Sequence, residues 1–214
     1  MKTSIISLVA LGVFCAGAAN AQDFTTNAKG DLIVHVRATQ VAPDKDAAIL
    51  TAAGADTGLK AHVGNDVKPT LGFTYFLTDK VAVEAILGTT HHEIRARGPG
   101  TDVVVHEAWV LPPVVTLQYH PLPSARVSPY VGAGLNYMLF YKNSDKNGFK
   151  VGLDDGIGYA LQAGVNIKLR NQWLVNADVK KVFFDTDAKI NDGALKAKVD
   201  LDPLVTSVGL SHLF

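Results

Sequence analysis

The chain has 214 residues, and 20 lysine and arginine residues balance 20 aspartate and glutamate residues. This balance excludes a generally basic nucleic-acid-binding protein, so no nucleic acid is expected as a partner. After residue 21, no stretch holds the roughly 18 uninterrupted apolar residues that a membrane-spanning helix requires.

The first 21 residues have the pattern of a secretory signal peptide. A positive start precedes an apolar run over residues 5–19, and an Ala-Asn-Ala cleavage motif ends at Ala21. We therefore expect residues 1–21 to be removed and the mature domain, 22–214, to leave the cytoplasm. Cleavage removes one lysine and the only cysteine, which leaves 19 basic against 20 acidic residues and no disulfide bond.

The first half of the mature chain alternates apolar residues with polar or small ones, as β-strands do. The alternating segments are 32–39, 70–77 and 81–88. A tight turn at 78–80 joins the last two segments. The longer polar stretches 42–66 and 91–106 are expected to be loops.

The second half repeats this scheme with five more alternating segments. They cover residues 109–120, 131–141, 158–169, 173–180 and 204–214. Short turns are expected at 121–126 and 170–172, and long polar loops at 142–156 and 186–196.

The eight segments are joined by connections that alternate between long and short. A membrane barrel sorts its connections in this way, because short turns face the periplasm and long loops face outward. A half-buried sheet of a soluble sandwich also alternates, but it has no reason to sort its loops by side. We therefore predict an all-β fold, an eight-stranded antiparallel up-and-down transmembrane β-barrel with short periplasmic turns and long extracellular loops. Its predicted location is the outer membrane of a Gram-negative cell.

The last segment has the features of the strand that closes such a barrel. It is about 10 residues long, which is enough for a tilted strand to cross a bilayer. Leu210, His212 and Phe214 lie on its predicted lipid-facing side, and the chain ends on the aromatic Phe214. These three residues are a candidate carboxy-terminal signal for the barrel-assembly machinery.

Several polar and charged residues are predicted to point into the barrel, and we call them the polar plug. They are His35, Arg37, Glu84, Gln118, His120, Lys168, Asp178 and Lys180. Eight strands leave an interior about wide enough for side chains to fill. One interpretation is that the plug only holds the barrel together. The other is that it also prevents a solute from passing straight through.

A second inward set, nearer the predicted outer end, is apolar, and we call it the funnel. Its residues are Ile94, Val110, Met138, Phe140, Val182 and Phe184. An apolar inner surface is unexpected in a water-filled pore but suits a hydrophobic ligand. An apolar seal that packs the loops is an equally good explanation of the residues alone.

Leu111, Pro112 and Pro113 are expected to interrupt the backbone ladder. A proline donates no backbone hydrogen bond, and within sheets it is confined to edges and bulges. Since a closed barrel has no edge, one missing donor should face each neighbouring seam. The segment is then either a bulge that adjusts curvature or a lateral exit from the barrel.

Histidines His91, His92 and His106 do not predict a metal or catalytic site. Adjacent residues of a strand point to opposite faces, so His91 and His92 cannot both bind one ion without distortion. The chain has no G-x-S-x-G or H-E-x-x-H motif, and we expect neither an enzyme nor a cofactor. A lipid-modifying enzyme and a structural or adhesive barrel remain the alternative functions.

Several segments together resemble the OmpW family of small outer-membrane barrels. They are VAVEAI (81–86) leading to HEI (92–94), LPPV (111–114) running into QYH (118–120), PYVGAGLNY (129–137), and DPL (202–204) through Phe214. The resemblance implies a porin-like eight-stranded barrel that passes small hydrophobic molecules across the outer membrane, and it favours a funnel over a seal. It implies outer-membrane lipid and lipopolysaccharide as surroundings. The chain is also similar to proteins that serve as bacteriocin or phage receptors.

Overall fold

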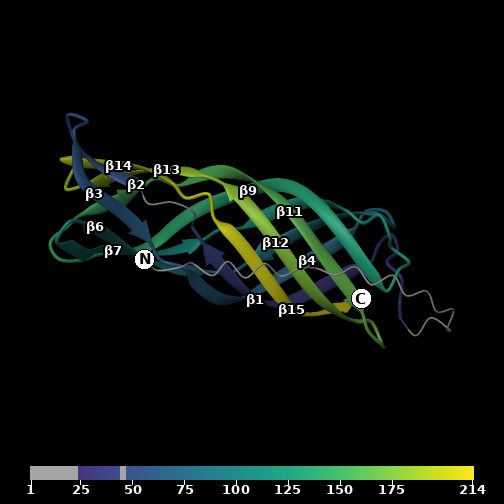
Figure 1. Ribbon diagram of the computed structural model, residues 1–214. Coiled ribbons are helices and arrows are strands. Elements are labelled where there is room, and N and C mark those ends of the chain that lie inside the picture. Colours follow the sequence, from purple (N-terminus) through teal and green to yellow (C-terminus); the bar gives the residue numbers. More distant parts are fainter. Residues whose placement is uncertain (1–23, 44–46) are drawn as a thin grey trace.

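The structure, a computed structural model, describes residues 24–43 and 47–214 (Figure 1). Strands joined by turns make up the ordered elements. None of the described residues belongs to a helix long and apolar enough to span a membrane. The predicted signal peptide, 1–21, lies outside the described residues.

Within the described residues, eight strands form a closed antiparallel barrel, which we call the membrane barrel. Its strands are β1 (Leu32–Ala42), β4 (Asp66–Phe76), β5 (Val81–Leu87), β8 (Val114–Tyr119), β9 (Val127–Asp145), β11 (Gly156–Lys168), β12 (Trp173–Phe183) and β15 (Leu204–Leu213). The last strand pairs with the first from Ile33–Leu213 to Ala42–Leu204, and this ladder closes the barrel. The predicted eight-stranded antiparallel barrel is therefore confirmed.

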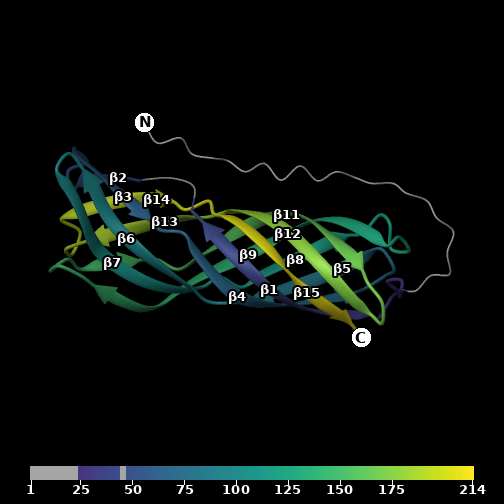
Figure 2. The same cartoon turned by 60° about the horizontal axis from the view of Figure 1, so that its bottom comes forward.

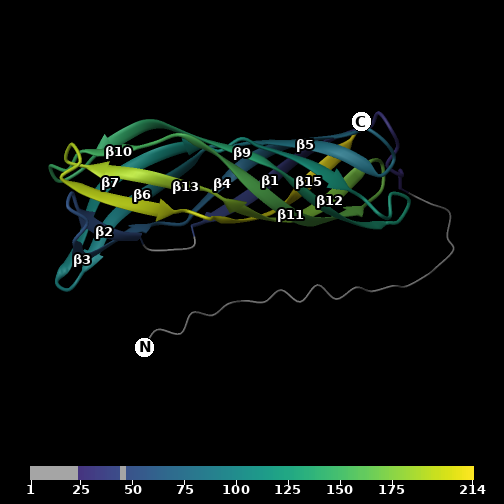
Figure 3. The same cartoon turned by 90° about the horizontal axis from the view of Figure 1, so that it is seen from above.

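A second set of strands continues the barrel beyond one end, and we call it the outer sheet. Its strands are β2 (Ala47–Thr51), β3 (Asp56–Val63), β6 (Thr90–Gly98), β7 (Thr101–Leu111), β10 (Val151–Leu153), β13 (Asp185–Ile190) and β14 (Leu195–Asp200). The outer end of β9 pairs with β7 and so runs through both sheets. Figure 1 shows these strands at the end opposite to the carboxy terminus, and Figure 2 and Figure 3 show the same division from two other sides.

The outer sheet corrects the expected nature of the long connections. Much of each stretch expected to be a loop is β-strand. Three stretches hold the hairpins β2–β3, β6–β7 and β13–β14, and the stretch after β9 holds the short strand β10, which pairs with β13. The stretches concerned are 42–66, 91–106, 142–156 and 186–196. They connect the spanning strands on the expected side, and their described residues form strands joined by turns and short irregular segments.

These outer strands were missed because the pattern of polar and apolar residues inverts between the two sheets. In the membrane barrel, outward residues such as Val36 and Leu135 are apolar, and many inward residues are polar. In β13, by contrast, Asp185, Asp187 and Lys189 are exposed while the residues between them are buried. A strand in water turns its polar side outward, so a strongly polar sequence still forms a sheet there.

Glycine at 164 illustrates how the membrane barrel accommodates a large inward side chain. A Cβ atom at Gly164 would collide with the ring of Tyr130, whose strand pairs with β11 at this position. The absence of a side chain therefore gives the tyrosine room inside the barrel.

The first prediction concerns the sidedness of the connections. An epitope tag inserted after Gly98, in the β6–β7 hairpin, or after Lys146, in the connection between β9 and β10, should bind antibody on intact cells. A tag at Arg170, in the short turn between β11 and β12, should be reached only after the outer membrane is permeabilised. Equal labelling of all three sites on intact cells would contradict the assigned topology.

The second prediction concerns the carboxy-terminal residue. The backbone of Phe214 exchanges two hydrogen bonds with Leu32, at 2.8 and 3.1 Å, and its ring is 67% exposed toward the lipid side. Deleting Phe214 removes both bonds and the end of the lipid-facing stripe formed with Leu210 and His212. We expect a lower yield of heat-modifiable folded barrel, measured by electrophoretic mobility, than with Phe214→Tyr as the control. An equal yield from the truncated chain would exclude an assembly role for this residue.

Candidate functional site

The structure places all eight side chains of the polar plug inside the membrane barrel. Their exposed fractions range from 0% to 3%. They reach the interior because they occupy alternate positions on five different strands and on the turn after β8, with neighbours of the opposite parity facing outward.

Four of these residues meet in the middle of the barrel, and we call them the charged cluster. The Arg37 guanidinium lies 2.7 Å from Glu84 Oε1, and Lys180 Nζ lies 3.1 Å from Glu84 Oε2. Lys180 Nζ is also 2.5 Å from Asp178 Oδ1. Two cations therefore face two anions, and the buried cluster carries no net charge. Buried charges are tolerated when they are paired in this way.

Neutral groups complete the hydrogen bonding of the two carboxylates. The Gln162 amide donates to Glu84 at 2.7 Å and to Asp178 at 2.6 Å, and the Tyr130 hydroxyl donates to Asp178 at 2.8 Å. Sequence reasoning did not select Gln162 or Tyr130 as site residues. Their positions in the sequence could have identified them. Gln162 lies on the same strand face as the inward Asn166, and Tyr130 lies on the same face as the inward Asn136.

The other members of the polar plug lie around the charged cluster. His35 is hydrogen-bonded to Ser211 at 2.7 Å and to Thr74 at 2.9 Å. His120 is hydrogen-bonded to Gln118 at 3.0 Å. Lys168 stands apart, because its ammonium donates to the Pro123 carbonyl in the turn at the periplasmic end.

An apolar layer closes the periplasmic end below the polar plug, and the sequence did not predict it. Its members are Ile33, Phe76, Ala82, Leu174 and Leu213. The ring of Phe76 lies 4.9 Å from the ring of His120, so this layer packs directly against the plug. The periplasmic half of the interior is thus filled first by polar and then by apolar side chains.

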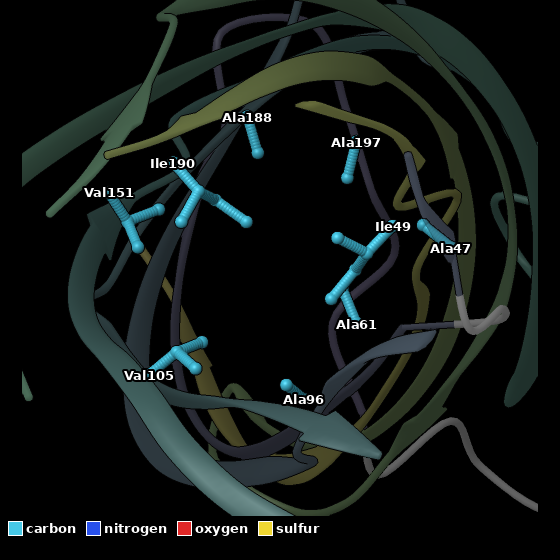
Figure 4. Packing of buried hydrophobic residues seen from close by; sticks show 9 residues of the cluster. All are labelled: Ala47, Ile49, Ala61, Ala96, Val105, Val151, Ala188, Ile190 and Ala197. Atoms are coloured by element: carbon cyan, nitrogen blue, oxygen red, sulfur yellow. The ribbon is translucent and has the colours of Figure 1, made fainter. Parts of the chain in front are cut away.

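Above the plug the interior opens into an outer cavity of about 870 Å³, a volume that includes space open to solvent. Most of its wall is apolar, and it includes the funnel residues Ile94, Val110, Met138 and Phe140. The outer sheet contributes small side chains. Figure 4 shows Ile49, Ala61, Val105, Ile190 and their neighbours pointing from several strands toward one central space.

An inner cavity of about 500 Å³ continues from the outer one toward the plug. The two share wall residues, among them Thr90, Pro112 and Met138. The funnel residue Val182 lines the inner cavity, and Phe184 packs in the same buried cluster as Val110 and Met138. Five of the six funnel residues therefore line the two connected cavities, and Phe184 packs in the buried cluster beside them. Lys180 of the charged cluster also lines the inner cavity.

The barrel wall is interrupted beside this space at Leu111, Pro112 and Pro113. The ladder between β5 and β8 ends at Ile86–Val114, and the ladder between β6 and β7 begins at Thr90–Val110. Residues 87–89 and 111–113 lie between the two ladders, and Pro112 lines both cavities.

Residues 111–113 lose pairing on one side more than on the other. One missing donor had been expected on each side. Toward β9, the Pro113 carbonyl accepts a hydrogen bond from the Tyr137 amide at 3.1 Å, and Leu111 pairs with Leu139. The weak seam is therefore the one that faces residues 87–89. A further proline, Pro69, lies on the other side of that segment, in β4, and sequence reasoning missed it.

The histidines His91, His92 and His106 point to three different places. His91 packs on Trp109 outside the barrel, with ring centroids 5.1 Å apart, and His106 is 3.0 Å from Asp145. His92 lines the outer cavity, and its Nδ1 donates to the Gly64 carbonyl at 2.8 Å. Burial lowers the pKa of His92 below its ordinary value of 6.5, which keeps this part of the wall uncharged at neutral pH.

Comparison with known proteins matches the sequence pattern of the OmpW family to residues 28–214. The uncharacterised outer-membrane protein y4mB of Sinorhizobium fredii is 43% identical over 150 residues, which are 68% of this chain and 65% of that protein. The chain thus covers just under two thirds of that relative.

Two further proteins resemble the chain over more of their length. The dibenzothiophene metabolism operon protein PahQ of Pseudomonas aeruginosa is 30% identical over 180 residues, or 82% of this chain and 85% of PahQ. The crystal structure of the outer-membrane protein OprG from Pseudomonas aeruginosa superposes with a TM-score of 0.82 at 30% identity. The superposition covers 88% of this chain and 98% of OprG.

The third prediction tests the balance of the charged cluster. Arg37→Met and Glu84→Leu should each lower the free energy of unfolding by about 3–5 kcal/mol, because each leaves the buried charged cluster with one uncompensated charge. The double variant keeps Lys180 with Asp178 and should lose clearly less than the two single losses combined. Urea unfolding of the reconstituted barrel measures all four proteins. Additive losses would show that Arg37 and Glu84 are not coupled.

Proposed function

Since the chain belongs to the OmpW family, we propose that this outer-membrane barrel passes small hydrophobic molecules across the outer membrane. We further propose that these molecules leave sideways into the bilayer at Leu111, Pro112 and Pro113. One observation carries the proposal: a continuous apolar space ends on a filled polar plug, beside an interrupted stretch of barrel wall.

Entry from the outside is favoured by the apolar lining of the outer sheet. A hydrophobic solute that leaves water for this lining gains about 25 cal/mol for each Å² of apolar surface that it buries. The polar outward face of the same strands suits water and lipopolysaccharide headgroups, so the outer sheet separates the solute from both. This arrangement supports an apolar solute rather than an ion or a sugar.

Passage straight through to the periplasm is opposed by the contents of the lower barrel. A solute on that path would have to separate the charged cluster, whose members are paired at 2.5–3.1 Å. An apolar molecule cannot replace those ion pairs, and unpaired charges in the interior are strongly destabilising. It would then have to displace the apolar layer around Phe76 and Leu174.

The lateral route avoids both obstacles. At Pro112 the cavity wall consists of a segment whose backbone is outside both neighbouring ladders, and Gly88 opposite it contributes no side chain. Opening this seam breaks fewer hydrogen bonds than opening a regular ladder would. The solute enters hydrocarbon directly, so its apolar surface is not exposed to periplasmic water again.

The printed name of one relative agrees with this solute class. PahQ is named for a dibenzothiophene metabolism operon, and dibenzothiophene is an apolar polycyclic compound. The name supports an apolar solute for this chain without identifying it.

The fourth prediction tests the lateral exit. Replacing both Pro112 and Pro113 with valine should restore one backbone donor toward residues 87–89. One additional hydrogen bond of about 1 kcal/mol would reduce opening, and therefore uptake of an apolar dye, by about fivefold. Uptake is measured on intact cells at equal surface level, with Pro121→Val in a periplasmic turn as the control. If the double variant took up dye at the wild-type rate, the exit would not lie at this seam.

A further inference from the structure

We infer that the bottom of the inner cavity recognises a neutral hydroxyl group at the end of an otherwise apolar solute. This inference rests on the proposed function and narrows its substrate class from hydrocarbons in general to hydroxylated ones, such as long-chain primary alcohols. Asn136, Thr39 and Thr70 carry the recognition, and all three line the inner cavity.

Asn136 supplies a hydrogen-bond acceptor. Its side chain is only 1% exposed, and its Oδ1 atom has no hydrogen-bond partner among the described residues. The amide orientation is fixed, because Nδ2 donates to the Pro113 carbonyl at 3.3 Å and Oδ1 therefore takes the other position. A buried acceptor without a partner is costly, so a donor brought by the solute would be favourable.

The threonines supply a donor. Thr39 Oγ1 lies 2.7 Å from Thr70 Oγ1 and 2.9 Å from Ser207 Oγ. These two hydrogen bonds use two of the three hydroxyl protons, so one proton is left for another acceptor. Two of the three hydroxyls that can present it, those of Thr39 and Thr70, line the cavity.

The charges nearby favour a neutral group over a carboxylate. Lys180 also lines the inner cavity, but it is paired with Glu84 at 3.1 Å and Asp178 at 2.5 Å, and Arg37 is paired with Glu84. The charged cluster has no surplus positive charge for an anion. A carboxylate also brings only acceptors, and it would face the acceptor of Asn136.

A hydroxyl group carries both functions that these cavity-lining side chains can use. It donates one hydrogen bond, which suits Asn136 Oδ1, and it accepts another from a threonine. Its hydrocarbon tail would extend along the apolar walls, which include Ile86, Val114, Met138 and Val182. An alkane satisfies neither polar atom, and a ketone or an ether satisfies only the donor.

The experiment compares radiolabelled 1-decanol, decane and decanoate in intact cells that carry equal amounts of folded barrel. Rates in cells without the barrel are subtracted, because the three compounds cross the outer membrane differently by themselves. The test variant is Asn136→Leu, which keeps the volume and removes the acceptor. The Pro113 carbonyl keeps its hydrogen bond from the Tyr137 amide in this variant, so the barrel should still fold.

Ser128→Ala is the matched control. Ser128 lies on the same strand, is also fully buried, and also has an unpartnered side-chain oxygen among the described residues. It is near the periplasmic end of β9, outside both cavities. A change caused only by removing a buried polar atom would appear equally in both variants.

The expected result is a ratio of 1-decanol to decane uptake about fivefold lower in Asn136→Leu than in wild type and in Ser128→Ala, the factor given by one net hydrogen bond. In lipid nanodiscs, the side-chain amide resonance of Asn136 should shift with 1-decanol but not with decane. An unchanged ratio in Asn136→Leu, or a preference for decanoate, would overturn the inference while the proposed function stands. No barrel-dependent uptake of any compound would overturn the proposed function and the inference with it.

Discussion

The need to pair every backbone group inside the membrane shapes this protein. Hydrocarbon offers no partner for a free N–H or C=O, so the spanning strands close through β1 and β15. The ladder between β5 and β8 ends near the outer limit of the membrane barrel, where Pro112 and Pro113 remove donors. This interruption is an exception to the pairing that closure requires. It lies where the two apolar cavities meet the barrel wall, since Pro112 lines both.

Charge neutrality is the second condition that the interior satisfies. The four members of the charged cluster come from β1, β5 and β12, three strands far apart in the sequence. Their pairing fills the barrel without a surplus charge, and Gln162 and Tyr130 use the remaining lone pairs. The lower part of the interior is consequently filled by paired polar side chains, and the cavities lie above them.

Alternation was enough to predict the spanning strands, the side of each connection and the inward position of residues such as Arg37 and Lys180. It was not enough for features that depend on other strands. Tyr130 was missed because its segment seemed to begin at Val131, and the apolar layer around Phe76 because inward residues were expected to be polar. Pairing partners also could not be read from one strand, so the asymmetric interruption at Pro113 emerged only from the structure.

The continuity of β9 has a consequence for how the molecule loses its structure. Among the described strands, β9 is a single strand that pairs with β8 and β11 in the membrane barrel and, beyond an irregularity, with β7 in the outer sheet. The other described connections between the two sheets pass through a proline, a glycine or a short irregular segment, where one ladder ends before the next begins. Local unfolding follows such boundaries, and regions with separate ladders open as separate cooperative units. The outer sheet is therefore expected to unfold at lower free energy than the spanning ladders, with β9 as the strand that links the two units.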